Sequence, residues 1–239
     1  MRGAKPGLNY EDPLIYLPRR PAYEIGKGRV IYNEMNPPTH LYVVILGRVK
    51  VSSMNGDGRQ SVSRIVRTEG LFGESCLIGT SRDGESATAL DNVMLMGWDR
   101  AEIEMRVEQE PRLGMALYQY LVHQCLELKD RIETMAVHKT PERVMLGLLQ
   151  LATDLGTEAE DGSTRLAHLT HDTIAEFIGT SREIVSGQMN RLRRLGLIRY
   201  SRKRLDIDTQ ALVDELKRQG MCIPLGAEAL AQAAGMQLC

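Results

Sequence analysis

The chain has 239 residues and a formal net charge of −1; 43% of its residues are hydrophobic and 26% are charged. This composition is typical of a folded globular protein and excludes the disordered and fibrous classes. Its four cysteines are scattered without a C-x-x-C pair, and no segment approaches the roughly 18 apolar residues that span a bilayer. We therefore expect a cytoplasmic protein with reduced thiols and no membrane partner.

The N-terminal part of the chain has the pattern of a small antiparallel roll or barrel. Between residues 23 and 98, short β-rich runs such as Leu41–Ile45 and Val93–Met96 are broken by turn residues. The segment Asn55-Gly-Asp-Gly58 lies between two such runs and tolerates the positive φ that a hairpin turn requires. We predict a β-roll domain over residues 14–109.

A long helix is predicted over residues 110–138, because Glu110-Pro111 opens a stretch in which apolar side chains recur on one stripe. Such a helix spans roughly 36 Å, which is longer than a small roll can cover, so we expect a dimer seam. A helix packed only on its own domain is the alternative. The predicted dimer interface comprises Leu113, Leu117, Leu121, Leu128, Ile132 and Met135.

The segment His171–Leu192 has the pattern of a helix-turn-helix. Small and apolar residues lie where two short helices would cross, and a glycine supplies the turn between them. Thr180 or Ser181 is expected to cap the second helix. The crossing residues are Ile174, Ala175, Ile178 and Val185, and the turn residue is Gly179.

The second of these helices is predicted to read DNA. Its leading residues would meet base edges, where Arg182 can read guanine and Glu183 can accept from the cytosine amino group. Between Arg182 and Arg204, eight basic residues outweigh the single acid Glu183, a local surplus of +7. The alternative is a helical hairpin with solvated charges. The predicted DNA-binding residues are Thr170, Thr180, Ser181, Arg182, Glu183, Ser186, Gly187, Gln188, Asn190, Arg191, Arg194 and Arg202, with the later arginines suited to phosphates.

The segments Leu195–Tyr200 and Ser201–Ile207 follow as a β-hairpin, which favours a winged helix over residues 139–216. With this wing, residues 14–216 resemble the CRP/FNR family of transcription regulators, through Ser181-Arg-Glu-x-Val185 and Leu195-Gly-Leu-Ile198. The resemblance implies an α+β fold and a homodimer on an inverted-repeat operator of double-stranded DNA, with RNA polymerase as a partner. We can assign no function to the tail, residues 217–239.

One departure from the family pattern lies within the recognition helix. Family members often carry an arginine one position after the residue that matches Ser186, but this chain has Gly187 there. The base contact from that turn is therefore lost, shifted to Gln188, or replaced by a closer approach of the backbone.

The roll carries a segment similar to the family's cyclic nucleotide cassette, at Gly70–Gly79 and residues 82–89. The resemblance implies an arginine and a serine on the cyclic phosphate, yet aligning Ser86 places Glu85 where the arginine belongs. Two anions repel in a partly buried site, so cAMP is not expected to bind, and a different effector or none remains open. The candidate effector pocket comprises Gly73, Glu74, Ser75, Cys76, Arg82, Glu85, Ser86 and Leu128.

Neither a metal, nor haem, nor an iron–sulfur cluster is signalled, because the five histidines lie apart and no cysteine precedes Cys76. Cys76 is either a redox switch, with its thiol pKa lowered at a helix N-terminus, or a small buried side chain. The chain has no glycine-rich phosphate loop, metal-ligand cluster or nucleophile motif, so no enzyme activity and no catalytic residues are expected. The runner-up function is a non-catalytic cyclic-nucleotide-binding or redox-sensing module that acts on a protein partner.

Overall fold

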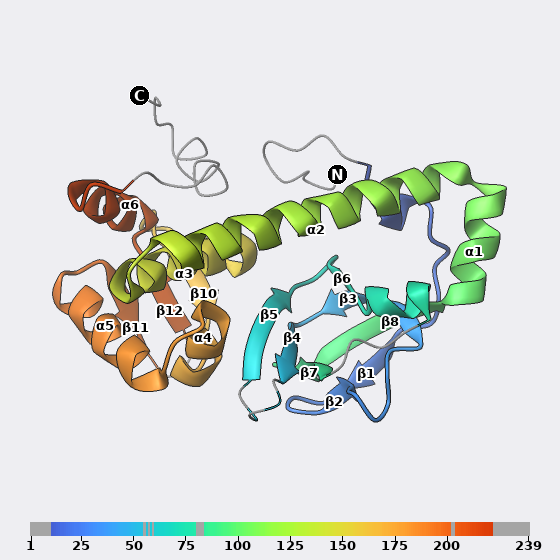
Figure 1. Ribbon diagram of the computed structural model, residues 1–239, viewed down its shortest axis with the longest axis horizontal. Helices are drawn as coiled ribbons and strands as arrows, with labels where there is room; N and C mark the ends of the chain where they lie inside the picture. Colours follow the sequence, from blue (N-terminus) through green and yellow to red (C-terminus); the bar gives the residue numbers. More distant parts are fainter. Residues whose placement is uncertain are drawn as a thin grey trace. The chain divides into compact units, whose positions relative to one another are not determined.

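The computed structural model describes residues 11–54, 56, 58, 60–79, 84–201 and 204–221 (Figure 1). Two predicted site residues, Arg82 and Arg202, lie outside them, as do part of the predicted Asn55–Gly58 turn and the tail beyond residue 221. Contacts divide the chain into two compact units, one over Tyr10–His123 and the other beginning at Gln124. No helix in the described ranges is long and apolar enough to cross a membrane.

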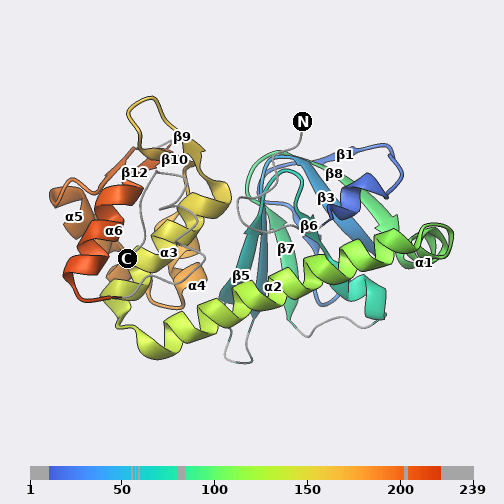
Figure 2. The same ribbon diagram turned by 90° about the horizontal axis from the view of Figure 1, so that it is seen from above.

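The first unit contains the predicted roll, built from two four-stranded antiparallel sheets (Figure 2). One sheet has the order β1 (Tyr23–Ile25), β8 (Val93–Asp99), β3 (His40–Leu46) and β6 (Leu71–Phe72). The other has the order β2 (Val30–Tyr32), β7 (Glu85–Ala89), β4 (Val49–Met54) and β5 (Gln60–Val66). Valines, alanines and stacked aromatic rings from both sheets form one buried cluster, with Tyr42 and Phe72 5.2 Å apart between ring centroids.

Two helices follow the roll. The first, α1 (Arg100–Gln109), was not expected from the sequence, although Asp99 and Glu102 have the spacing of a capping box. Asp99 accepts from the Glu102 N–H at 2.8 Å, and Glu102 accepts from the Asp99 N–H at 3.1 Å. The second is the predicted long helix, α2 (Pro111–Val137), which is continuous across the boundary between the two units.

The start of α2 packs into the roll's own core, which corrects the predicted dimer seam. Leu113 and Leu117 are 0% and 7% exposed and belong to one buried cluster with Leu71 and Trp98. A side chain enclosed by its own subunit has no surface left for a partner. The structure therefore assigns Leu113 and Leu117 to the core instead of the seam.

This assignment predicts a large stability effect for Leu113→Ala. We expect the free energy of unfolding to fall by about 2–5 kcal/mol, because truncating a fully buried leucine leaves a cavity. The matched control is Leu46→Ala, which removes a side chain that is 60% exposed on β3 and should change stability by less than about 0.5 kcal/mol. Urea unfolding at a fixed protein concentration measures both. Equal effects would contradict the core assignment.

The second unit contains the predicted winged helix. Its helices are α3 (Thr140–Leu155), α4 (His171–Ile178), α5 (Arg182–Arg194) and α6 (Thr209–Arg218). Its sheet has the order β11 (Ile198–Tyr200), β12 (Arg204–Ile207), β10 (Thr164–Ala167) and β9 (Thr157–Glu158). The chain thus has the α+β architecture predicted from the sequence. Gly147 lets α3 approach α4 closely, because a Cβ there would lie 2.7 Å from the Ile178 Cγ1 atom.

Candidate DNA interface and sensor interior

Helices α4 and α5 form the predicted helix-turn-helix (Figure 1). Thr170 caps α4 by accepting from the Thr173 N–H at 3.1 Å, and Ser181 caps α5 by accepting from the Ile184 N–H at 3.4 Å. Gly179 has a φ of 73°, a left-handed conformation that favours glycine at the turn. The four predicted crossing residues are all buried.

The two faces of α5 differ in chemistry. Val185, Met189 and Leu192 are buried on the face that packs against the rest of the unit. The polar side chains lie elsewhere on the helix: Arg182, Glu183, Asn190, Arg191 and Arg194 are exposed, as is Gly187, and Ser186 and Gln188 are partly exposed. The predicted base-reading and phosphate-binding residues of α5 are therefore available to a ligand. A Cβ added at Gly187 would have no atom within 4 Å, so that turn of the helix presents bare backbone.

Two side chains that were absent from the predicted site, His171 and Tyr200, contact α5 and hold it in place. The His171 Nδ1 and Ser186 Oγ atoms share a hydrogen bond of 2.8 Å, and the Tyr200 hydroxyl on β11 donates to the Asn190 Oδ1 at 3.1 Å. The Arg193 guanidinium lies 5.2 Å from the centre of the Tyr200 ring. Ser186 and Asn190 thus have partners within the protein, and the wing strand contacts the recognition helix directly.

The leading turn of α5 carries one charge of each sign. The Arg182 Nε atom lies 3.8 Å from the Asp172 Oδ1 atom, which biases the guanidinium position before any ligand binds. Hydrogen bonds from its own backbone N–H and from Ser181 lower the pKa of Glu183. Its carboxylate is therefore ionised at neutral pH and acts only as an acceptor.

Two arginines bind the C-terminal end of α4, next to the turn. Arg131 on α2 donates to the Phe177 carbonyl and lies 4.5 Å above the centre of the Phe177 ring, and burial lowers the pKa of this guanidinium to about 10. Arg143 on α3 donates to the carbonyls of Ile178 at 3.1 Å and Gly179 at 2.6 Å. These bonds satisfy carbonyls that a helix end leaves without partners, so the end of α2 and the helix-turn-helix are fastened together.

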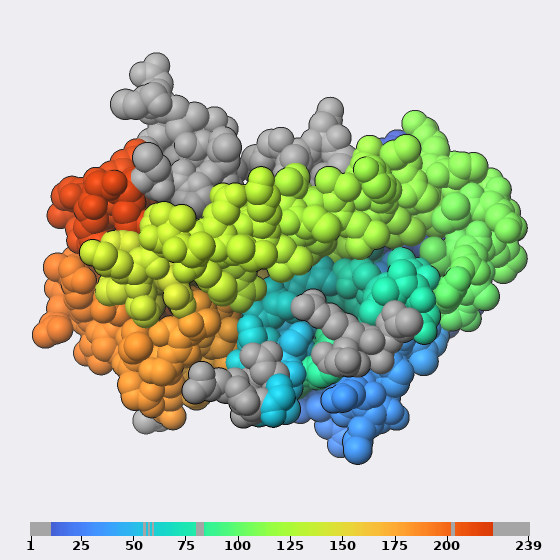
Figure 3. Space-filling model, viewed as in Figure 1, coloured from blue at the N-terminus to red at the C-terminus, as the bar shows by residue number. Residues whose placement is uncertain are grey.

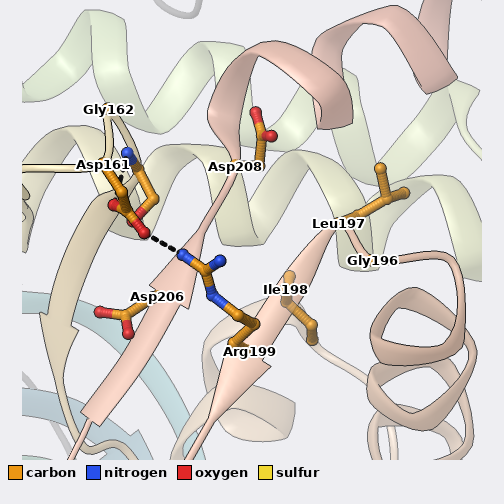
Figure 4. Close-up of a pocket in the computed structure, with 9 residues that line it drawn as sticks. Asp161, Gly162, Gly196, Leu197, Ile198, Arg199, Asp206 and Asp208 are labelled. Carbon is orange, nitrogen blue, oxygen red and sulfur yellow. Dashed lines mark hydrogen bonds and ion pairs between the residues drawn. The ribbon is translucent and has the colours of Figure 1, made fainter.

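An acidic recess lies between the wing strands and the loop before β10 (Figure 4). Asp161, Asp206 and Asp208 line it, and Arg199 crosses it to pair with Asp161. Hydrogen bonds from Ser163 and from Arg199 lower the pKa of Asp161 to about 2. Asp206 also pairs with Arg165 at 2.8 Å and with Arg204 at 3.2 Å, so guanidinium groups balance most of the carboxylate charge of this recess.

Comparisons with known proteins agree with this architecture. The cyclic nucleotide-binding domain model matches residues 23–110, and the Crp-like helix-turn-helix domain model matches residues 142–215. The CRP-like cAMP-activated global transcriptional regulator of Mycobacterium tuberculosis is 29% identical over 181 residues, which cover 75% of this chain and 80% of that protein. The transcriptional regulator SdrP of Thermus thermophilus is 30% identical over 164 residues, which cover 68% of this chain and 76% of that protein.

A solved structure points to the same family. The crystal structure of a CRP/FNR-family transcriptional regulator from Thermus thermophilus matches with a TM-score of 0.66 at 30% identity, over 81% of this chain and 97% of that one. This chain belongs to the CRP/FNR family. The CRP/FNR regulator is a non-catalytic transcription factor that binds DNA through its helix-turn-helix.

Within the roll of this CRP/FNR regulator, several predicted pocket residues bind other side chains of the same roll. Glu74 begins the short 3-10 helix η2 (Glu74–Ile78) and pairs with Arg64, while Glu85 accepts from the Tyr32 hydroxyl at 2.9 Å. Ser86 and Ser52 share a hydrogen bond of 3.1 Å. Arg64, Tyr32 and Ser52 were missed, because they lie outside the cassette, on β5, β2 and β4.

The remaining members of the predicted pocket differ in placement. Gly73 has a φ of 83°, and a Cβ there would lie 2.7 Å from the His40 carbonyl oxygen, so only glycine fits. The buried Ser75 hydroxyl has no hydrogen-bond partner among the described residues. Leu128 belongs to the second unit, whereas the other described members belong to the first.

Of the two alternatives for Cys76, a redox switch and a small buried side chain, the structure favours the second. It is 7% exposed and packs in the cluster that also holds Leu113. Burial, with the nearby Glu74 charge, raises the pKa of its thiol to about 11. The lowered pKa that the redox-switch alternative requires is therefore not found, and the thiol is protonated at neutral pH.

The exposed side of α2 carries a long apolar stripe in this CRP/FNR regulator. Figure 3 shows α2 as a continuous yellow-green band at the surface. Of the predicted seam, Leu121, Leu128 and Ile132 are 39%, 46% and 67% exposed, whereas Met135 also faces the turn at Gly179. The stripe also includes Met115, Tyr118, Val122 and Leu126, which were not predicted.

Proposed function

We propose that this regulator binds an inverted-repeat operator as a homodimer, with α5 of each subunit in a major groove. The observation that carries the proposal is the exposed polar surface of α5, on a helix held by its caps, by His171 and by Tyr200. The proposed contacts are Thr170, Thr180, Ser181, Arg182, Glu183, Gly187, Gln188, Arg191, Arg194 and Arg202, with Ser186 and Asn190 acting as positioning residues.

The apolar stripe of α2 supports the dimer. Tyr118, Val122 and Leu126 recur every four residues, and Leu128, Ile132 and Met135 recur every three or four, as in helices that pair with a second helix. Exposure of such a stripe to water is unfavourable, and packing against α2 of a second subunit would bury it. We place the dimer seam on this stripe, the sensor over residues 14–109 and the DNA-binding domain over residues 139–216.

The proposal is tested by selecting bound fragments from a genomic library and footprinting them. We expect two inverted half-sites whose centres lie about 10 base pairs, or one helical turn, apart. A pool without an enriched symmetric motif would contradict it and favour a module that acts on a protein partner. Such a regulator would work in the cytoplasm, where RNA polymerase is its further proposed partner.

We further propose that the protein does not respond to cAMP, unlike what the name of the Mycobacterium tuberculosis relative states for that protein. Glu85 lies next to Ser86 on β7, and its carboxylate already accepts a hydrogen bond from the Tyr32 hydroxyl. A phosphate brought to this strand would meet a negative charge in a partly buried place.

Calorimetric titration with cAMP should therefore give no binding at micromolar ligand. Glu85→Arg should raise the affinity by at least about tenfold, because it replaces a repulsive charge with a phosphate-pairing one. Glu108→Arg on α1 makes the same charge change outside the roll's interior and is the control. A low micromolar dissociation constant for the unmodified protein would overturn the proposal.

A further inference from the structure

Three side chains inside the roll form a network that joins three elements of the fold. Arg64 on β5 donates from Nη1 to the Tyr120 hydroxyl at 2.9 Å and pairs through Nη2 with Glu74 of η2. Tyr120 on α2 in turn donates to the Leu71 carbonyl at 2.8 Å. Only 24% of the Arg64 side chain and 22% of the Glu74 side chain are exposed.

This network uses the groups that a diffusible effector would need. Glu74 belongs to the candidate effector pocket, and its Oε1 atom is bound by Arg64 and lies 3.2 Å from the Tyr120 hydroxyl. Glu85 and Ser86 are likewise bound by neighbouring strands, whereas the buried Ser75 hydroxyl has no hydrogen-bond partner among the described residues. A ligand at this place would have to displace a partly buried ion pair from its partners.

The network is also placed to control α2. The first turns of α2 lie on the roll through Leu113 and Leu117, and Tyr120 is the next residue along that side of the helix to contact the roll. Removing one member of a partly buried ion pair leaves the other charge desolvated and unpaired, which is strongly unfavourable. The guanidinium therefore holds η2 and α2 against the same strand.

We propose that the Arg64 guanidinium acts as a built-in effector, which fixes α2 on the roll so that operator binding requires no small molecule. The inference rests on the proposed function, in which paired α2 helices present α5 to the two half-sites. It differs from the absence of cAMP binding, because it assigns the effector's role to a particular side chain of the protein.

The test compares Arg64→Ala with the matched control Arg67→Ala, which removes an exposed arginine three residues further on. Each protein is unfolded, refolded in buffer free of small molecules, and titrated with labelled operator by fluorescence anisotropy. We expect the unmodified protein and Arg67→Ala to bind equally, and Arg64→Ala to bind at least about tenfold more weakly. Methylguanidinium chloride at millimolar concentration should restore operator binding by Arg64→Ala and should not affect the other two proteins. Potassium chloride at the same concentration should not restore binding.

Each outcome has a separate meaning. Loss of operator binding by the refolded unmodified protein, with recovery on adding cell extract, would overturn the built-in effector while keeping the proposed function. Unchanged binding by Arg64→Ala, or a loss that methylguanidinium does not reverse in a protein with normal circular dichroism, would also overturn it. If Arg64→Ala does not fold, Tyr120→Phe decides: it should weaken operator binding about threefold to tenfold with normal circular dichroism, and unchanged binding would overturn the inference.

Discussion

The double substitution Leu121→Glu and Leu128→Glu should convert the protein from a dimer into a monomer. Both side chains lie on the exposed stripe of α2 and would place carboxylates against a second copy of the helix. Each would be desolvated without a partner, an effect of about 3–5 kcal/mol for an uncompensated buried charge. The dimer dissociation constant should therefore rise at least about a hundredfold, measured by sedimentation equilibrium.

The matched control is Leu46→Glu, which makes the same chemical change at a side chain that is 60% exposed on β3, outside α2. It should leave the dimer intact, and circular dichroism should show that all variants are folded. A monomer for the unmodified protein at micromolar concentration would contradict the dimer. A double variant that remains dimeric would place the interface on another surface.

The helix-turn-helix could be predicted closely because its signals are local. The cap at Ser181, the left-handed turn at Gly179 and the buried Val185 each depend on neighbours within a few residues. The roll was predicted for the same reason, since alternating short runs and turn residues identify strands without naming their partners.

The parts that escaped prediction depend on contacts between distant residues. Arg64 and Tyr120 are 56 positions apart, and Arg131 and Phe177 are 46 apart, so no sequence window contains either pair. A periodic pattern shows which side of a helix is apolar, but it does not show what covers that side. Leu113 was therefore grouped with the exposed stripe of α2, although it lies in the roll's core.

Cys76 shows a second limit of local signals. Its position within a short helix suggested a lowered thiol pKa, whereas the surrounding cluster removes it from water and raises the pKa. Burial is set by the whole fold, so the sign of such a shift could not be read from the helix alone.

Arg182→Ala and Arg194→Ala should affect DNA binding differently: the first should change sequence preference, and the second should change affinity for all sequences. Arg182 lies on the leading turn of α5, where a side chain enters the major groove, whereas Arg194 is the last residue of the helix and should reach only the DNA backbone. Loss of a bidentate base contact should weaken specific binding by about 1–3 kcal/mol per half-site and relax the preference at one base pair. Loss of a phosphate contact should weaken binding to all sequences about equally and flatten the salt dependence by roughly one unit per half-site.

Both variants are titrated against the selected operator and a scrambled duplex at several salt concentrations, so each serves as the control for the other. The ion pair between Arg182 and Asp172 alters this expectation little, because exposed pairs contribute less than about 1 kcal/mol and the guanidinium is free to move to a base. The decisive quantity for each variant is the ratio of its affinity for the operator to its affinity for the scrambled duplex. A dimer carries each substitution twice, which doubles the effect on either duplex. If Arg182→Ala lowers affinity for both duplexes by the same factor, α5 binds only the DNA backbone and its assignment as the base-reading helix is wrong.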